Sequence, residues 1–236
     1  MRIDVITAFP KIVRDPLNES ILKQAQQRIG LQINVLGLRD FTTDKHRTID
    51  DAPYGGGPGM ILKPEPLFNV LEHIFAETKD RQSCRVILPT PQGELFQQKA
   101  AADLSGAEHL VFICGHYKAI DQRVIETFVT DEFSIGDFIL SGGELPALLM
   151  IDSIVRLIPG VLGDMESART DSFQDNLLDC PYYTRPEDFR GLKVPEVLLS
   201  GNHQKIAQWR QAQKAARTRE RRPDLYEKFE EKEEDK

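Results

Sequence analysis

The chain has 236 residues, of which 40% are hydrophobic and 28% charged, and its 37 acidic and 30 basic side chains give a formal net charge of -7. This composition is that of a folded protein, and it excludes a wholly disordered chain, a collagen-like repeat and a small disulfide-stapled protein. The longest apolar stretch, 147–163, contains Asp152 and Arg156, so no membrane-spanning helix is expected.

Hydrophobic periodicity predicts alternating strands and helices over the first two thirds of the chain. The predicted elements in chain order are strand 3–9, helix 16–29, strand 33–38, helix 64–78, strand 85–88, helix 97–104, strand 109–114, helix 120–128, strand 132–135 and helix 145–158. Strands that alternate with helices indicate a largely parallel sheet covered on both faces. Residues 1–162 are therefore expected to form one α/β domain.

The periodic pattern ends after residue 162. Residues 163–176 are rich in Asp, Ser and Thr and are predicted to be an interdomain linker. Residues 177–236 are mostly helical and charged in pattern, which predicts a small C-terminal domain that is marginally stable alone. The acidic tail from Glu227 is expected to be solvated and partly disordered.

Basic residues gather in one part of this C-terminal segment. They are Lys205, Arg210, Lys214, Arg217, Arg219, Arg221 and Arg222. A solvated helix face would explain a lysine-rich run, but most of these residues are arginines, which suit bidentate contacts with phosphates. Trp209 and Tyr226 lie within and just after the run, where nucleic-acid bases could stack. The segment is therefore predicted to bind RNA.

Two features of the sequence, the cysteines and the pattern of the first residues of the chain, indicate the cellular compartment. Cys84, Cys114 and Cys180 lack the close spacing of metal or redox sites, so they are expected to be reduced, buried thiols. The first residues enter a strand pattern directly, without the features of a signal peptide. A cytoplasmic location is expected.

Three predicted loops follow predicted strands and contain glycine or proline: 88–93, 114–117 and 134–146. Ligands of open parallel sheets bind beyond the carboxyl ends of strands, so three such loops favour a small-molecule site over simple turns. Neither GxGxxG nor GxxxxGK[ST] occurs, which weakens a dinucleotide or P-loop interpretation. The glycine-rich segment 53–60 follows no clear strand and is interpreted as a flexible loop, with a substrate clamp as one role.

Six segments resemble the bacterial tRNA (guanine-N1)-methyltransferase family. They are 50–60, 134–146 (SIGDFILSGGELP), 158–163 (IPGVLG), 177–186 (LLDCPYYTRP), 199–203 (LSGNH), and 217–218 with 221–225 (RT and RRPDL). The resemblance covers almost the whole chain, in order, and leaves out only the acidic tail after Tyr226.

The resemblance implies a SPOUT-type parallel sheet with a deep trefoil knot, which holds S-adenosylmethionine in a bent conformation. Periodicity by itself predicts an ordinary doubly wound sheet, because knots are nearly absent from proteins. The implied partners are tRNA and a second copy of the chain, in a homodimer with a shared active site. The implied cofactor-binding residues are Leu88, Pro89, Thr90, Pro91, Gly115, Tyr117, Ser134, Ile135, Gly136, Phe138, Leu140, Gly142, Gly143 and Pro146.

The implied reaction is methylation of N1 of guanine 37, beside the anticodon, in tRNAs with guanine at position 36. Neutral guanine carries a proton on N1, so the reaction needs a base, and the resemblance assigns this role to Asp171. Negative charge then grows on O6, where the resemblance places Arg156 as the stabilising cation.

Simpler roles compete with these assignments. Asp171 could cap the next helix, and Arg156 could be solvent-facing or ion-paired. Asp137, Glu144 and Asp152 are alternative acids, for which structural roles are expected. The family is associated with magnesium dependence, but no ligand cluster in this chain indicates a dedicated metal site.

The segment 114–121 departs from the commonest family form, Cys-Gly-Arg-Tyr-Glu-Gly-Ile-Asp, in having His116, Lys118 and Ala119. Lys118 reverses a charge and is predicted to pair with the cofactor carboxylate or with a tRNA phosphate. Ala119 adds a Cβ atom where a left-handed backbone would be costly. The Lys118 and Ala119 changes support one alternative, a non-catalytic tRNA-binding protein. A related SPOUT enzyme that methylates another RNA position is a second alternative, which Asp171 disfavours, because a base placed for a ring N–H suits guanine.

Overall fold

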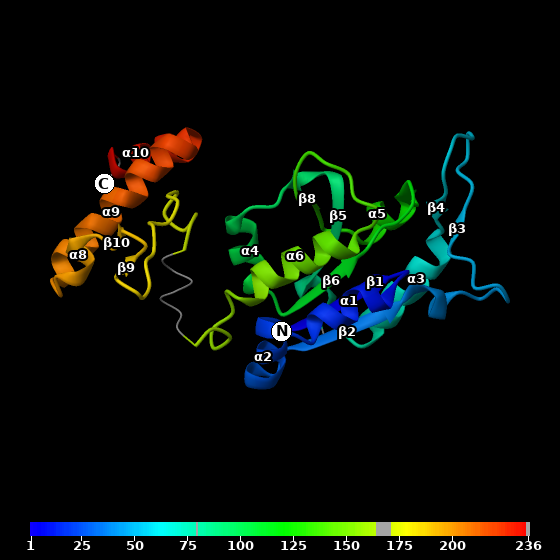
Figure 1. The fold of residues 1–236 in the computed structure, drawn as a ribbon. Helices are drawn as coiled ribbons and strands as arrows, with labels where there is room; N and C mark the ends of the chain where they lie inside the picture. The colour runs from blue at the N-terminus through cyan, green and yellow to red at the C-terminus, as the bar shows by residue number, and fades with distance from the viewer. Residues whose placement is uncertain (79, 164–170, 235–236) are drawn as a thin grey trace. The chain divides into compact units, whose positions relative to one another are not determined.

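The computed structural model describes residues 1–78, 80–163 and 171–234. The chain divides into two units, Met1–Gly163 and Asp164–Lys236, and each is described by itself (Figure 1). This division lies beside the boundary predicted at residue 162. Half of the predicted linker 163–176, namely residues 164–170, falls outside the described residues.

A parallel sheet forms the centre of the N-terminal unit. Among the described residues its strands are, in spatial order, β2 (Gln32–Gly37), β1 (Arg2–Thr7), β6 (His109–Ile113), β5 (Cys84–Leu95) and β8 (Asp131–Ser134). Every pairing between these strands is parallel. The α/β class with a parallel sheet is thereby confirmed. All residues of β6 are buried, as expected for a strand with helices on both faces.

Helices cover both faces of this sheet (Figure 1). The helices α1 (Pro10–Leu17), α2 (Ser20–Ile29), α4 (Gln98–Ser105) and α6 (Glu144–Val155) share one hydrophobic cluster with Leu110 and Phe112 of β6. The helices α3 (Pro64–Ala76) and α5 (Gln122–Phe128) share a second cluster with Val111 and Ile113 of the same strand. Alternate side chains of one strand therefore supply two separate cores.

The prediction of one helix over 16–29 is wrong, because two helices occupy this region. The side-chain amide of Asn18 donates to the carbonyl oxygen of Arg14 at 2.7 Å, and the Asn18 N–H donates to Asp15 at 3.1 Å. These bonds satisfy the last carbonyls of α1, so the helix ends at Leu17. Ser20 has a φ of 48°, and the chain changes direction there before α2.

The predicted loop 88–93 lies within β5, which continues to Leu95. Both Pro89 and Glu94 pair with Phe133 of β8, so the residues between them form an irregularity in the ladder. Gly93 allows this shape, because a Cβ atom there would lie 2.3 Å from the carbonyl carbon of Glu132. The sequence pattern missed the continuation because prolines usually interrupt a strand.

The glycine-rich segment 53–60 lies between two short strands that the pattern also missed. These strands, β3 (Asp50–Asp51) and β4 (Ile61–Leu62), pair antiparallel, and β4 pairs in parallel with β7 (Ala119–Ile120). The glycine-rich hairpin, defined as residues 50–62, is seen at one end of the unit (Figure 1). Two-residue strands are too short to produce a period-2 pattern.

The described part of the C-terminal unit begins with residues 171–187, which form turns but no helix or strand. It continues with the antiparallel pair β9 (Asp188–Phe189) and β10 (Leu192–Lys193). Three helices follow: α8 (Glu196–Leu199), α9 (His203–Arg221) and α10 (Pro223–Glu234). The side chain of Asn202 caps α9 by accepting from the N–H of Lys205 at 3.1 Å.

The acidic tail is helical as far as Glu234, so the prediction of a partly disordered end is wrong for its described residues. Pro223 occupies the first position of α10, where proline is well tolerated. Half-buried Leu225, Tyr226 and Phe229 lie on this helix, which packs against α9. These apolar side chains hold the first turns of α10 against α9.

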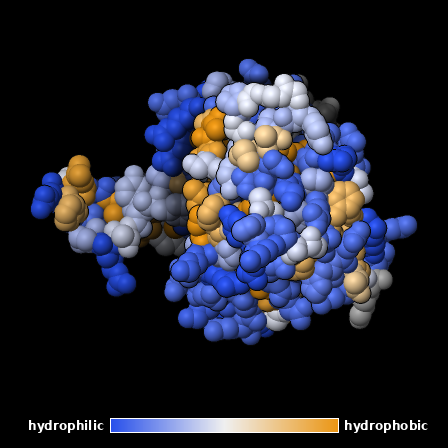
Figure 2. Space-filling view, turned by 90° about the vertical axis from the view of Figure 1, so that its right-hand side faces the viewer, coloured by the Kyte–Doolittle hydropathy of each residue, from blue (hydrophilic) through white to orange (hydrophobic). Residues whose placement is uncertain are grey.

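Each of the three cysteines is buried and unbonded, as expected for small apolar side chains. No helix of the described chain is long and apolar enough to cross a membrane. The face shown in Figure 2 is mostly hydrophilic, with hydrophobic side chains in separate patches.

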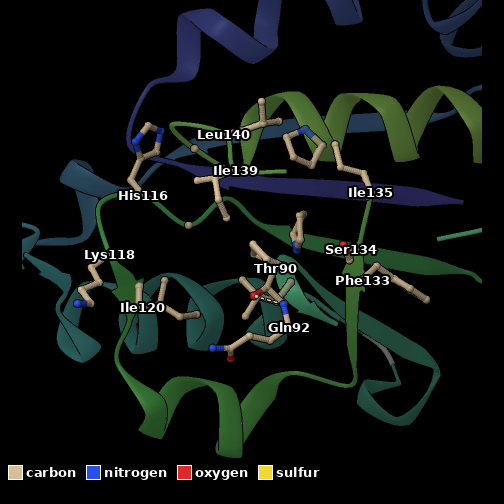
Figure 3. A pocket seen from close by; sticks show the side chains of 18 of the residues that line it. Thr90, Gln92, His116, Lys118, Ile120, Phe133, Ser134, Ile135, Ile139 and Leu140 are labelled. Atoms are coloured by element: carbon tan, nitrogen blue, oxygen red, sulfur yellow. Dashed lines mark hydrogen bonds between the residues drawn. The ribbon is translucent and has the colours of Figure 1, made fainter. Parts of the chain in front are cut away.

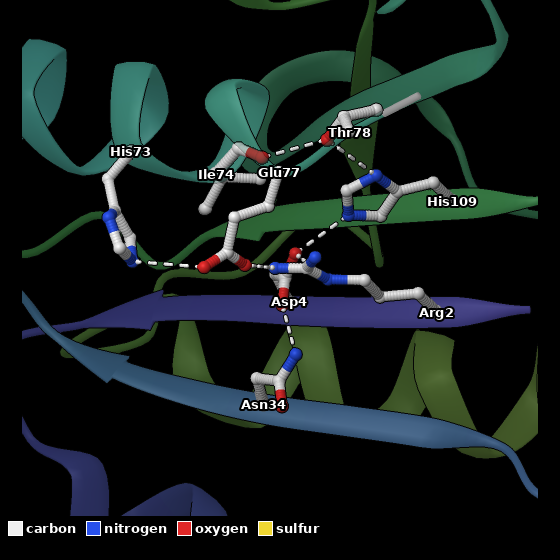
Figure 4. Close-up of polar contacts among 8 residues, drawn as sticks. All are labelled: Arg2, Asp4, Asn34, His73, Ile74, Glu77, Thr78 and His109. Carbon is white, nitrogen blue, oxygen red and sulfur yellow. Dashed lines mark hydrogen bonds and ion pairs between the residues drawn. The ribbon is translucent and has the colours of Figure 1, made fainter. Parts of the chain in front are cut away.

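A polar cluster lies inside the amino-terminal part of the sheet (Figure 4). The fully buried carboxylate of Asp4 accepts from Asn34 at 2.7 Å, and Nε2 of His109 and Nε of Arg2 lie 2.7 Å and 2.9 Å from it. Burial by itself would raise the pKa of Asp4, but the bonds from His109, Asn34 and Arg2 and the charge of Arg2 hold it below its ordinary value. The charged form of Asp4 therefore stabilises the fold.

Asp4→Asn is expected to lower the free energy of unfolding at pH 7 by about 3 kcal/mol, because it breaks a buried charged cluster. The folded-state pKa of Asp4 lies below its ordinary 3.8, so the wild-type chain loses this contribution as the pH falls through that lowered value. Urea unfolding from neutral pH to below about pH 4 should show a weaker acid dependence in the variant. Asp15→Asn, at an exposed position, is the control. Equal acid dependence in Asp4→Asn and wild type would contradict the assignment.

Candidate active site

A cavity of about 480 Å³ lies beside the carboxyl ends of β6 and β8 and the irregular middle of β5 (Figure 3). All of the residues predicted to bind the cofactor, from Leu88 to Pro146, line this cavity. They come from three separate segments of the chain, which are the irregular part of β5, the loop after β6, and the stretch from the end of β8 into α6, and the fold brings them together. The cavity also includes Gln92 and His116, which were not among the predicted cofactor-binding residues but belong to two of the predicted loops, 88–93 and 114–117. It includes Lys118 as well, for which the sequence predicted a contact with the cofactor carboxylate or an RNA phosphate.

Two glycines let the loop after β8 lie directly against the loop after β6. The N–H of Gly143 donates to the carbonyl oxygen of Gly115 at 2.8 Å, and Gly142 forms a β-bridge with His116. A Cβ atom on Gly143 would lie 2.8 Å from Cα of Cys114, and one on Gly142 would lie 2.2 Å from Nε2 of His116. Side chains at these positions would separate the loops and open the wall of the cavity.

Glu144, the first residue of α6, joins these loops to the central strand β1. Its side chain is almost fully buried, and Oε1 accepts from the hydroxyl of Thr7 at 2.5 Å. Its Oε2 lies 2.7 Å from Nε2 of His116, whose ring packs against Phe9 at 4.6 Å between centroids. The start of a helix is a favourable place for a carboxylate, because unpaired N–H groups point towards it. The arrangement supports a structural role for Glu144.

The thiol of Cys114 lies close to this carboxylate. Burial raises the pKa of Cys114 well above its ordinary value, and the charge of Glu144 raises it further. Cys84, on the neighbouring strand β5, has its pKa raised to about 11, mainly by burial. Both thiols are therefore protonated at neutral pH and act as small apolar side chains, not as nucleophiles.

The two residues predicted to act on guanine belong to different units of the chain. Arg156 is half-buried at the carboxyl end of α6, where its N–H donates to Asp152 at 3.2 Å. Asp171 is half-buried at the start of the described part of the C-terminal unit, whereas Arg169 and Thr170 of the same motif lie outside the described residues. The alternative that Asp171 caps the next helix is wrong, because no helix begins between 171 and 195. The competing acids Asp137 and Asp152 are exposed.

The departures from the commonest family motif have separate structural outcomes. The prediction that Ala119 has a strained left-handed backbone is wrong, because Ala119 lies in strand β7. The residue with a left-handed backbone in this segment is Tyr117, whose φ is 60°. Phe138, one of the predicted cofactor-binding residues, is 53% exposed at the cavity edge. In the described chain, no group of three or more His, Cys, Asp or Glu side chains is placed to hold a metal ion. Magnesium dependence stays a prediction.

The predicted RNA-binding residues fall into two groups. Lys214 lies 3.2 Å from the carboxylate of Asp179, and Arg217 donates to the carbonyl oxygen of the same residue at 3.1 Å. Arg219 stacks over the ring of Tyr226, and Arg222 pairs with Asp224. The remaining three are exposed and form no ion pair with described residues: Lys205, Arg210 and Arg221.

The fold and the cavity define an α/β protein with a small-molecule site at the carboxyl ends of parallel strands. Residues 1–228 match the family model described as tRNA (Guanine-1)-methyltransferase TrmD. The chain therefore belongs to this family, which confirms the resemblance of its motifs.

Curated relatives named tRNA (guanine-N(1)-)-methyltransferase match nearly the whole chain. The protein of Staphylococcus carnosus is 55% identical over 229 residues, 97% of this chain and 92% of the relative. That of Anoxybacillus flavithermus is 53% identical over 230 residues, 98% of this chain and 93% of the relative. That of Staphylococcus aureus is 54% identical over 229 residues, 97% of this chain and 92% of the relative.

Gly143→Ala is expected to lower the free energy of unfolding by about 1–3 kcal/mol, because the added Cβ atom overlaps the backbone of Cys114. Gly106→Ala is the matched control, because the nearest atom to its added Cβ is 3.5 Å away. Urea unfolding of both variants measures the difference. Equal stability of the two variants would show that the loops are not tightly packed at Gly143.

Proposed function

We propose that the chain transfers a methyl group from S-adenosylmethionine to N1 of guanine 37 in tRNAs that carry guanine at position 36. One observation carries the proposal: residues from three separate segments of the chain, each matched by resemblance to the family's cofactor site, line one cavity. The family and its named relatives supply the reaction and the class of substrate.

The cavity suits the cofactor in size and in the chemistry of its walls. Apolar residues such as Pro89 and Ile135 line the cavity and suit an adenine ring. The glycine-rich turn 141–143 presents backbone groups that can hold polar atoms. When bound, S-adenosylmethionine supplies an electrophilic methyl group.

The two predicted catalytic side chains act on the base. The Asp171 carboxylate removes the proton from N1 of guanine, which leaves a lone pair there for the methyl group. The Arg156 guanidinium stabilises the negative charge that develops on O6 at the same time. The half-buried position of both side chains supports these roles, because charged groups act more strongly where water is partly excluded.

The proposal extends to a SPOUT fold with a deep trefoil knot in the C-terminal part of the sheet. Two observations support it: the loop after β8 lies against the loop after β6 through Gly143 and Gly115, and α6 then packs against α1. A chain that returns so closely to an earlier loop needs residues without side chains at the crossing. Gly142 and Gly143 meet this need.

A homodimer is part of the same proposal. Exposed hydrophobic side chains gather on α6 and on the loop before it: Phe138, Ile139, Leu140, Leu145 and Leu149. Of these, Ile139 is 79% exposed and Leu145 59% exposed. Adjacent exposed apolar residues of this kind mark protein interaction sites. A second copy of the chain that covers them would complete the site. The tRNA substrate of the proposed reaction supports a cytoplasmic location.

Asp171→Ala is expected to lower the rate of methyl transfer by about 10²- to 10⁴-fold, because guanine N1 then keeps its proton. The assay follows labelled methyl groups from S-adenosylmethionine to N1 of unmodified tRNA with guanines at positions 36 and 37. Asp175→Ala, at an exposed position four residues away, is the control. A variant as fast as wild type would refute the assignment of Asp171. Tight tRNA binding by a wild-type chain without transfer would favour the non-catalytic alternative.

Arg210→Gln is expected to weaken tRNA binding and to reduce the slope of log affinity against log salt by about 0.7–0.9 for each phosphate that the variant no longer neutralises. The measurement is a salt titration of tRNA affinity. Lys99→Gln, on the exposed side of α4, is the control of equal charge change. Identical slopes for Arg210→Gln and wild type would exclude this part of α9 from the RNA interface.

A further inference from the structure

The charge of the cavity is unusual for a site that receives a zwitterionic ligand. Among the described residues that line it, His116 and Lys118 are the side chains able to carry a positive charge, and no Asp or Glu is present. A ligand with a carboxylate and an ammonium group therefore finds a protein partner of opposite charge only for its carboxylate.

His116 is not available for this contact. Its Nε2 lies 2.7 Å from the buried carboxylate of Glu144, and its ring packs against Phe9. Turning the ring towards a ligand would leave the carboxylate of Glu144 buried without this partner, which is costly. Lys118 is thus the remaining cationic side chain.

Hydrogen bonds hold the backbone of Lys118 in place, whereas its side chain extends into solvent. Its N–H donates to the carbonyl oxygen of Met60 at 3.1 Å, and the next residue, Ala119, pairs with Ile61 of β4. The glycine-rich hairpin therefore holds the backbone of Lys118 at the cavity. Its side chain is exposed and forms no hydrogen bond or ion pair with described residues.

The carboxylate nearest to Lys118 in sequence, that of Asp121, forms no ion pair with it, because it is paired with Arg123. Both oxygens of Asp121 accept from the guanidinium of Arg123 at 2.8 Å, and this pair lowers the pKa of Asp121. A lysine ammonium beside a cavity without another carboxylate partner suits an anion supplied by the ligand.

The two sides of the cavity differ in charge. Figure 3 shows Lys118 on one side, with His116 and Ile120, and Ser134 and Ile135 on the other. An amphipathic ligand would therefore place its anionic part towards Lys118 and its uncharged, planar part towards Ile135.

We propose that Lys118 binds the carboxylate of the amino acid part of the methyl donor, so that the cavity selects adenosyl ligands that carry this group. This inference rests on the proposed function, because it takes the ligand to be S-adenosylmethionine. Lys118 determines which adenosyl ligands bind, because its ammonium group forms a charge-assisted hydrogen bond with the carboxylate.

Calorimetric titration without tRNA tests the proposal. The ligands are S-adenosylhomocysteine and its decarboxylated analogue, which keeps the amine and lacks only the carboxylate. Lys118→Met is expected to weaken binding of S-adenosylhomocysteine by about tenfold, the effect of a hydrogen bond to a charged group, and to leave binding of the analogue unchanged. Lys118→Arg should retain most of the wild-type preference, and Lys99→Met, outside the cavity, should retain all of it.

Three other outcomes would overturn the proposal. Equal weakening of both ligands by Lys118→Met would mean that the lysine supports the shape of the cavity. Unchanged binding of both ligands, with weaker tRNA binding in a separate titration, would assign Lys118 to an RNA phosphate. Failure of the wild-type chain to bind either ligand would refute the cofactor and with it the proposed function, whereas the first two outcomes leave the proposed function intact.

Discussion

The buried carboxylate of Glu144 is the interaction on which the cavity depends. It accepts from Thr7 at the end of β1 and lies beside His116 in the loop after β6. Burial of a charge is costly unless hydrogen bonds compensate for it, so these contacts restrict the positions that α6 and both loops can take. Because Gly142 and Gly143 directly precede Glu144, the close approach of the loops and the position of the helix are set together.

The other wall of the cavity depends on an irregularity in β5. The ladder with β8 shifts between Pro89 and Glu94, and Gly93 lies against the backbone of Glu132 in a space that no side chain could share. Thr90 and Gln92 therefore lie at the cavity and do not continue a regular strand. Departures from regular pairing near a site are common because they direct residues towards a ligand.

The C-terminal unit uses its basic helix in two ways. Lys214 and Arg217 tie α9 to Asp179, and the buried hydroxyl of Thr218 accepts from the N–H of Leu178 at 2.7 Å. These contacts hold the otherwise irregular segment that follows Asp171. Basic residues on the exposed side, such as Arg210, face solvent and can bind a polyanion. The basic residues of α9 therefore divide into those that stabilise the fold and those that lie on the surface.

Much of the molecule follows from the sequence by itself. Apolar periodicity predicted the parallel sheet and most of its covering helices, and long motifs indicated the family and the residues around the cavity. Only the tertiary structure decided the partners of Glu144, because Thr7 is 137 residues away and no local pattern links them. The same holds for β3, β4 and β7, which are too short to show a period. Periodicity records which side chains are apolar, whereas distant hydrogen bonds and short strands form only when packing brings separate segments together.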